Sequence, residues 1–420
     1  MIKAGALLYS MFLVIVIAIV SSSFVLVNYY NNSYVIGILK QEELFRDVNS
    51  TINYGLTFHR DIPSNVLTVL DLFDDEQHIT SLTKKTWGAF YILSAEAQWK
   101  NKSVKKSVLT GVNINEGEKV ALYLADQNKP LSLTGNTKIV GNCYLPKAGV
   151  KRAYIEGKSF TGDKLIDGLK FYSEITLPPI NEDLINENQK NFSYLISSGD
   201  SIVDYELVRD KDSIVNSFTS KTLIFYSPFS MVLSNKVIDG NIIFKSEGQI
   251  TVRSNTFITS AILYAKGIVL EDNVTSSVQL FAQDSIMIGE KCKLTYPSVI
   301  ALLGKGNTTV SRKIIIAENV EITGAIFLYN ENLDRQKQSL VSIGEKCKIT
   351  GQIYSSELLE LKGEVIGGVF CQKVLLKTPS SIYENHLMDV VINREELSEH
   401  FVGAALTEEL SHQRIIKWLN

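Results

Sequence analysis

The feature that most constrains this chain is a repeat of about 18 residues within residues 233–391. The octet Ile-Gly-Glu-Lys-Cys-Lys-Leu-Thr at 288–295 returns as Ile-Gly-Glu-Lys-Cys-Lys-Ile-Thr at 343–350. Copies of this pattern begin at Val252, Leu270, Ile288, Ile316, Ile343 and Leu361, in steps of 18, 18, 28, 27 and 18 residues. Each long step contains a nine-residue polar segment, 304–312 or 330–338, and without it the period of 18 returns.

Short β-branched runs separated by Gly, Asn or Asp corners at this period are typical of a parallel β-solenoid. One turn cannot bury its own apolar face, so turns stack and equivalent Ile and Val side chains form ladders about 4.8 Å apart. The repeat therefore predicts a mainly β fold with a parallel, right-handed solenoid of 18-residue turns. The pattern resembles the bactofilin, or polymer-forming, type of β-solenoid, and that resemblance implies end-to-end association into filaments.

The composition adds two constraints. The net charge of −3 gives no electrostatic basis for binding nucleic acid. Cys292 and Cys347 occupy the same repeat position two turns apart. That separation is roughly 10 Å along a solenoid axis, beyond the limit of about 7 Å between the Cα atoms of a disulfide. We therefore expect both thiols to be ladder residues, not a disulfide or a metal site.

The N-terminus has the pattern of a membrane anchor. No charged residue lies between Lys3 and Lys40, and residues 7–27 form an apolar run of 21 residues. As a helix this run would cross about 30 Å of hydrocarbon, and it is longer than the apolar region of about 7–15 residues in a cleaved secretory signal. Residues 1–30 are therefore predicted to be a retained single span. Because Lys3 precedes the span, residues 31–420 are predicted to lie outside the cytoplasm.

The first residues, Met-Ile-Lys-Ala-Gly followed by Ala-Leu-Leu-Tyr-Ser, resemble the leader of type IV pilin-like proteins, including minor pseudopilins. Leaders of that family are short and basic, end in Gly and precede an apolar helix that is kept. The resemblance implies processing between Gly5 and Ala6. The family favours Phe or Met where this chain has Ala6, and most members carry an acidic residue where it has Ser10.

The remaining chain divides by pattern into three parts. Residues 31–130 are predicted to form a juxtamembrane α+β domain, with helical spacing first and strands over 87–99, 103–112 and 119–124. Residues 131–393 are predicted to form the solenoid, because 133–144 align with 343–354, and the polar stretch 177–220 is predicted to be an excursion from one corner. Residues 394–420 are predicted to be an amphipathic helix that caps the exposed edge of the last turn or docks a partner.

The sequence carries no recognisable catalytic motif. A nucleophile elbow, a phosphate-binding glycine loop, a dinucleotide fingerprint and zinc-ligand spacings are all absent. Glu290, Glu318 and Glu345 share one repeat column, and the lysines between them indicate a salt-bridged outer face more than a catalytic carboxylate pair. We therefore expect no catalytic residue, no cofactor and no bound metal.

These features predict a non-enzymatic, membrane-anchored structural or assembly protein. The expected setting is a bacterial cell surface, a pilus-like structure or a secretion apparatus, with other proteins of the assembly as partners. Inserted segments of a repeat fold often share a binding face, so 177–220, 304–312 and 330–338 are the expected contact surface. The alternatives are a filament-forming, bactofilin-like scaffold that associates with itself and a carbohydrate-binding or polysaccharide-cleaving solenoid.

Overall fold

The computed structural model describes residues 3–72, 79–115, 119–193, 201–304, 311–331, 337–407 and 412–419. The protein is mainly β with one long N-terminal helix, as predicted. Its contacts define two compact units. The helix unit comprises Met1–Lys84 and Leu93–Lys106, and the stack unit comprises Lys85–Ile92 and Ser107–Asn420.

The helix unit is built on α1 (Lys3–Thr57), a single helix of 55 residues. The predicted anchor therefore continues without a break into the helical stretch that follows it. Leu44, Val48 and Ile52 form the buried stripe of its C-terminal half. Gly55 allows close packing there, because a Cβ at this position would lie 2.9 Å from a methyl carbon of Leu82.

One sheet has the strand order β1-β2-β3-β4-β30. The bounds of its first four strands are β1 Leu67–Leu70, β2 Ile79–Trp87, β3 Phe90–Trp99 and β4 Lys102–Val112. The strands predicted over 87–99 and 103–112 correspond to β3 and β4. β1 pairs antiparallel with β2, as in a hairpin sheet.

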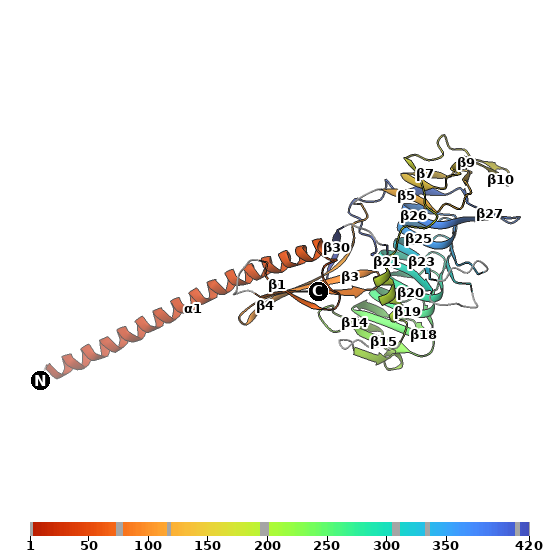
Figure 1. The fold of residues 1–420 in the computed structure, drawn as a ribbon. Coiled ribbons are helices and arrows are strands. Elements are labelled where there is room, and N and C mark those ends of the chain that lie inside the picture. The colour runs from red at the N-terminus through yellow and green to blue at the C-terminus, as the bar shows by residue number, and fades with distance from the viewer. Residues whose placement is uncertain are drawn as a thin grey trace. The chain divides into compact units, whose positions relative to one another are not determined.

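A closed and largely parallel sheet, the parallel stack, makes up most of the stack unit (Figure 1). Its central strands are β18 Ile242–Val252, β19 Phe257–Leu270, β20 Thr275–Ile288, β21 Lys293–Gly304, β22 Lys313–Ile316, β23 Glu321–Asn330, β24 Leu340–Ile343, β25 Lys348–Leu361 and β26 Glu364–Lys377. The Cα pairings join Val252, Leu270, Ile288, Ile316, Ile343 and Leu361 in this order. All five steps of the sequence repeat are thus confirmed as inter-strand register.

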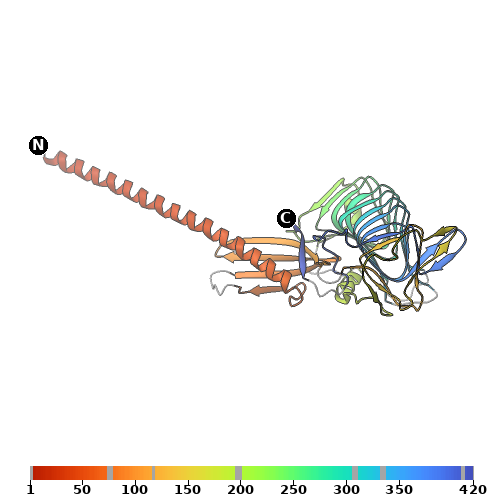
Figure 2. The same ribbon diagram turned by 90° about the horizontal axis from the view of Figure 1, so that it is seen from above.

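Strands of successive turns lie side by side in the parallel stack (Figure 2), and buried aliphatic side chains fill its interior. One column consists of Ile250, Ile268, Ile286, Ile314, Val341, Leu359 and Val374, none more than 1% exposed. Burying each such side chain contributes about 1.5–3 kcal/mol. Cys292 and Cys347 are buried in another row on either side of Val320, in the ladder positions that the repeat predicts.

A second hydrophobic cluster covers part of the outer face of the parallel stack. Tyr264 and Phe281 stack here with ring centroids 5.0 Å apart, and α2 (Glu182–Lys190) and residues 85–92 pack over this face. The Tyr264 hydroxyl donates to Asn188 Oδ1 over 2.7 Å, and Asn188 Nδ2 donates to the Gly88 carbonyl over 2.9 Å. These hydrogen bonds join α2, the stack and the turn between β2 and β3.

The order of turns in space differs from the order along the chain. β5 (Val120–Leu124) pairs with β26, and β7 (Lys138–Val140) pairs with β29 (Val391–Asn393). The N-terminal turns therefore follow the C-terminal ones in the parallel stack, as Figure 1 shows for β5 and β7 beside β26. The other strands at this end are β6 Leu131–Thr134, β8 Asn142–Leu145, β9 Val150–Arg152, β10 Tyr154–Ile155, β11 Lys158–Ser159, β12 Lys170–Tyr172, β27 Ile382–Glu384 and β28 His386–Met388.

The opposite end begins inside the stretch predicted to be an excursion. β13 (Ser201–Asp204) and β14 (Ser213–Asn216) pair in parallel with β15 (Leu223–Ser227) and β17 (Val237–Gly240). A short 3-10 helix, η1 (Tyr205–Val208), lies between β13 and β14, and β16 (Met231–Leu233) completes this end. The excursion prediction is thus only partly right, because 201–216 belong to the sheet and α2 lies outside it.

The predicted C-terminal helix over 394–420 is wrong. Residues 413–419 form β30 (Gln413–Leu419), which pairs antiparallel with β4. The edge of β4 offers unpaired backbone groups, and their hydrogen bonding is available to a strand of nearly any sequence. Leu397 and Phe401 are buried as the helical stripe implied, but they lie in irregular segments of the stack unit.

Candidate functional site

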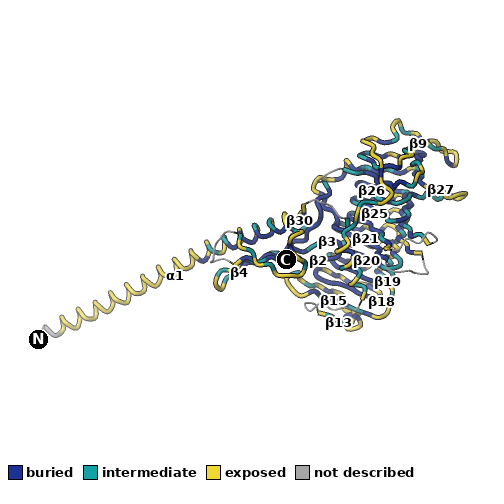
Figure 3. The backbone as a smooth tube through the Cα atoms, viewed as in Figure 1, coloured by how far each residue is buried: buried dark blue, intermediate teal, exposed yellow. Residues whose placement is uncertain are grey.

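The N-terminal half of α1 exposes nearly all of its apolar side chains (Figure 3). Over Gly5–Thr57 it is long and apolar enough to cross a membrane, and no other helix in the described part of the chain is. The exposed apolar side chains run from Leu7, 74% exposed, to Val27, 64% exposed, and resume at Val35 beyond a polar segment that contains Asn28, Asn31, Asn32 and Ser33. At 1.5 Å per residue the uninterrupted apolar run over residues 7–27 is about 30 Å long, which matches a hydrocarbon thickness of about 30 Å.

The far end of this apolar stretch is marked by aromatic and then by charged residues. Tyr29, Tyr30 and Tyr34 are exposed, and such rings favour the membrane–water interface. Lys102 Nζ donates to the Gly37 carbonyl over 2.9 Å, and Lys40 pairs with Glu43 over 2.6 Å. Packing of α1 within its own unit begins at this point.

Gly5 and Ala6 both lie in the first turns of α1. No atom comes within 4 Å of a Cβ built on Gly5, so local packing does not require glycine there. The Ser10 hydroxyl donates to the Leu7 carbonyl over 2.9 Å, which satisfies it within the helix as lipid requires. Processing between Gly5 and Ala6 stays a prediction.

Corners connect successive strands of the parallel stack along one side. Residues 253–256, 271–274, 289–292, 317–320 and 344–347 are corners of four residues, but only Lys362 and Gly363 join β25 to β26. Asn273, Lys291, Asn319 and Lys346 occupy the left-handed position of their corners, with φ of +64°, +56°, +58° and +56°. We call Lys362 and Gly363 the short corner. On its far side lies Asp389, whose φ is again +56°.

A cleft of about 910 Å³ opens at the short corner. We name it the charged cleft, because five lysines and five carboxylates line it without any aromatic side chain. The lining residues are Glu156, Lys158, Asn319, Glu321, Glu345, Lys346, Cys347, Lys348, Lys362, Gly363, Glu364, Leu376, Lys377, Thr378, Pro379, Met388, Asp389 and Val391.

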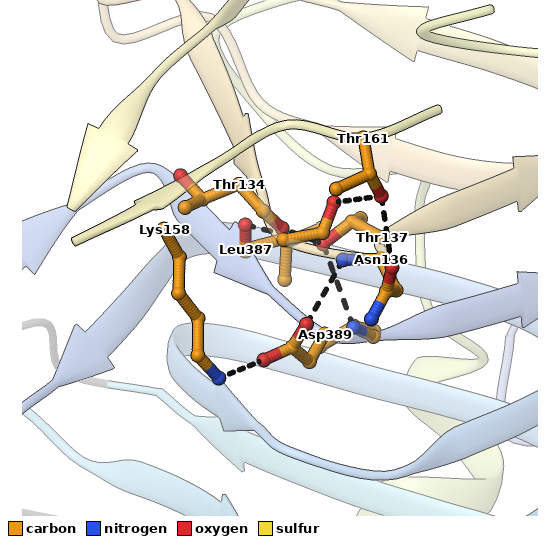
Figure 4. A network of polar contacts seen from close by, with 9 residues as sticks. Thr134, Asn136, Thr137, Lys158, Thr161, Leu387 and Asp389 are labelled. Carbon is orange, nitrogen blue, oxygen red and sulfur yellow. Dashed lines mark hydrogen bonds and ion pairs between the residues drawn. The ribbon is translucent and has the colours of Figure 1, made fainter. Parts of the chain in front are cut away.

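One wall of the charged cleft is a polar network around Asp389 (Figure 4). Lys158 Nζ lies 2.7 Å from one Asp389 carboxylate oxygen, and the Asn136 N–H donates to the other over 2.9 Å. Hydrogen bonding to Lys158 and Asn136 lowers the pKa of Asp389, and the Asp389 carboxylate raises the pKa of Lys158. Thr161 Oγ1 donates to Asn136 Oδ1 over 2.8 Å, which fixes this wall to the next segment.

Two of the lining lysines, Lys362 and Lys377, contact a nearly buried carboxylate. Glu360 lies 3.5 Å from Lys362 Nζ and 3.4 Å from Lys377 Nζ, and its side chain is 7% exposed. Ser342 Oγ donates to the same carboxylate over 3.0 Å. Two cations thus neutralise Glu360, and the cleft presents charges of both signs.

The glutamate column predicted from the repeat is confirmed. The Lys291 N–H donates to the Glu318 carbonyl, and the Asn319 N–H donates to the Glu345 carbonyl, so equivalent corners adjoin. Lys293 and Glu321 form a 2.9 Å ion pair between neighbouring strands, as a salt-bridged outer face requires. Over the described ranges, no group of three His, Cys, Asp or Glu side chains could hold a metal ion.

Sequence reasoning missed a buried polar cluster at the bases of the two nine-residue inserts. Arg312 Nη1 donates to Asn330 Oδ1 over 2.6 Å, and Asn330 Nδ2 donates to Glu357 Oε1 over 2.9 Å. All three residues are buried. Residues 305–310 and 332–336, the centres of the predicted contact surface, lie outside the described residues.

No family model matches the chain, and neither the curated proteins nor the solved structures contain a match.

Proposed function

We propose that the protein is a non-enzymatic, membrane-anchored structural or assembly protein of a bacterial cell surface, pilus-like structure or secretion apparatus. In this proposal the parallel stack is a β-solenoid that α1 holds outside the cytoplasmic membrane. The solenoid interpretation is supported by the pairing of residues 18, 27 or 28 positions apart in parallel register. Protein contacts, not chemistry, are its proposed activity.

The exposed apolar face of α1 is the observation that carries this proposal. A span of about 20 residues covers the hydrocarbon, so residues 28–39 would extend roughly 20 Å beyond it, first with a polar segment and then with apolar side chains. Val35, Ile36 and Leu39 lie in that extension and are each about half exposed. Exposed apolar surface of this extent is typical of a protein contact site. A membrane-embedded helix that continues beyond the bilayer with exposed apolar side chains suits a component of an assembly.

N-terminal sequencing of the membrane-extracted protein tests the pilin-like part of the proposal. We expect a mature N-terminus at Ala6, and we expect the Gly5→Leu variant to retain Met1. Gly37→Ala is the control for a glycine change elsewhere in α1. An intact Met1 in the wild type would contradict the pilin-like part. Release of the protein by alkaline carbonate would contradict the anchor itself.

A filament-forming scaffold is the second candidate, and the two ends of the parallel stack favour it. Among the described residues, β12 is paired with β8 alone at one end and β13 with β15 alone at the other, so each end presents an edge without a described partner strand. Tyr172 in β12 is 73% exposed. No C-terminal helix covers either edge in the described part of the chain.

Sedimentation of the full chain in detergent at rising concentration tests this candidate. Species that grow with concentration, and that Tyr172→Lys reduces, would support end-to-end association. Tyr154→Lys, at an equally exposed tyrosine of the β10–β11 hairpin, is the control. A constant monomer mass at the highest concentration would remove this candidate.

A further inference from the structure

Corners of four residues follow one another along one side of the parallel stack. The charged cleft lies where the two-residue corner, Lys362 and Gly363, takes the place of one of them. Lys346 and Asp389 are the left-handed tips on its two sides, and the two-residue corner between them has no such tip. A Cβ on Gly363 would lie 2.5 Å from the Cys347 carbonyl oxygen, so the two-residue corner packs closely against Cys347 and needs glycine at this position. Adjacent strands are about 4.8 Å apart, which is the thickness of one polypeptide chain.

Neighbouring corners are joined by a hydrogen bond from a backbone N–H of one corner to a carbonyl of the next, and this bond is missing at the charged cleft. The N–H groups of Asn273, Lys291 and Asn319 donate to the carbonyls of Glu290, Glu318 and Glu345, over 2.9, 3.2 and 3.0 Å. The short corner provides no equivalent carbonyl for the Lys346 N–H, which bonds no acceptor among the residues that the structure describes. The charged cleft therefore offers a ladder-type donor to an incoming carbonyl.

The charges around the charged cleft select against other linear polymers. The five lysines balance the five carboxylates, so the lining has no net charge that would attract an acidic glycan or a polycation. Sugar rings bind most often against aromatic faces, and none of the described residues that line the cleft is aromatic. Lys348 and Glu364 are directly paired across β25 and β26, so a guest meets both signs at neighbouring positions.

We propose that the charged cleft binds a polypeptide segment of another protein, one chain thick, that carries an acidic and a basic side chain close together. Its backbone takes the place of the missing corner and accepts from the Lys346 N–H. Its carboxylate lies near Lys348 and Lys362, and its cation lies near Glu345 and Glu364.

Titration of a labelled peptide against the full chain in nanodiscs tests this proposal. The probe is acetyl-Gly-Glu-Lys-Val-Lys-amide, the corner sequence 289–293 with Val in place of the thiol. We expect saturable binding that weakens as salt is added, since both partners carry charge. A Gly-Glu-Glu-Val-Glu peptide, chitotetraose and polygalacturonate are the comparison ligands, and we expect none to compete.

Filling the charged cleft gives the decisive variant. Insertion of Glu-Lys between Lys362 and Gly363 restores a corner of four residues, and we expect it to weaken probe binding at least tenfold. The same dipeptide inserted between Ser254 and Asn255, in a distant corner of the same row, is the matched control and should bind as the wild type does. Melting temperatures confirm that both fold. Equal binding by the filled variant, competition by a glycan, or no binding at millimolar probe would overturn the proposal.

Discussion

Charged substitutions in the middle of α1 provide the sharpest test of the membrane anchor, because their effect on the free energy of membrane insertion can be calculated. Residues 7–27 contain fourteen Leu, Ile, Val or Phe, and none of this part of α1 is buried. At about −0.3 to −0.6 kcal/mol each, these side chains favour insertion by about 4–8 kcal/mol. One arginine near the helix centre costs about 3 kcal/mol. A single Ile17→Arg change should therefore leave most of the protein in the membrane.

Two arginines bring the balance close to zero. We expect the Val14→Arg/Ile17→Arg double variant to appear largely in the carbonate-soluble fraction, whereas Ile17→Arg alone remains mostly pelleted. Asn31→Arg/Asn32→Arg adds the same charge beyond the span and should remain in the pellet. Complete release of the single variant would show that the lipid contact is weaker than the exposed surface implies. Full retention of the double variant would show that protein contacts, not lipid, hold the helix.

Three further changes test the stack unit. Tyr264→Phe removes a buried hydrogen bond and should cost about 1–3 kcal/mol in urea unfolding, whereas Tyr354→Phe, whose hydroxyl bond is 3.4 Å long, should cost less. Lys291→Gly removes the backbone strain of a non-glycine residue at positive φ and should raise the melting temperature. Lys293→Gly, within β21, should lower the melting temperature. The lowered pKa of Asp389 means that its stabilisation is present at neutral pH and lost as pH falls through the folded-state value. Between pH 7 and pH 3 the melting temperature of the Asp389→Asn variant should therefore fall less steeply than that of the wild type.

The inserts at 304–312 and 330–338 show a limit of pattern reasoning. Their polar composition identified them as insertions, and the register of Ile288, Ile316 and Ile343 confirms that the repeat resumes after each. The burial of Arg312 and Glu357 at their bases could not be predicted. A charged side chain next to a polar segment is usually exposed, and only the surrounding strands decide whether it is enclosed.

The sequence alone determined the register of the parallel stack, the ladder positions of its cysteines and the apolar reach of α1. These follow from periodicity, since a slip of one residue would turn every aliphatic side chain from the interior to solvent. The tertiary structure alone decided that β5 and β7 follow β26 and β29, that 413–419 pair as a strand with β4, and that a short corner opens the charged cleft. Backbone hydrogen bonds at a sheet edge carry almost no sequence information, so the segment that occupies an edge is chosen by the packing of the whole unit.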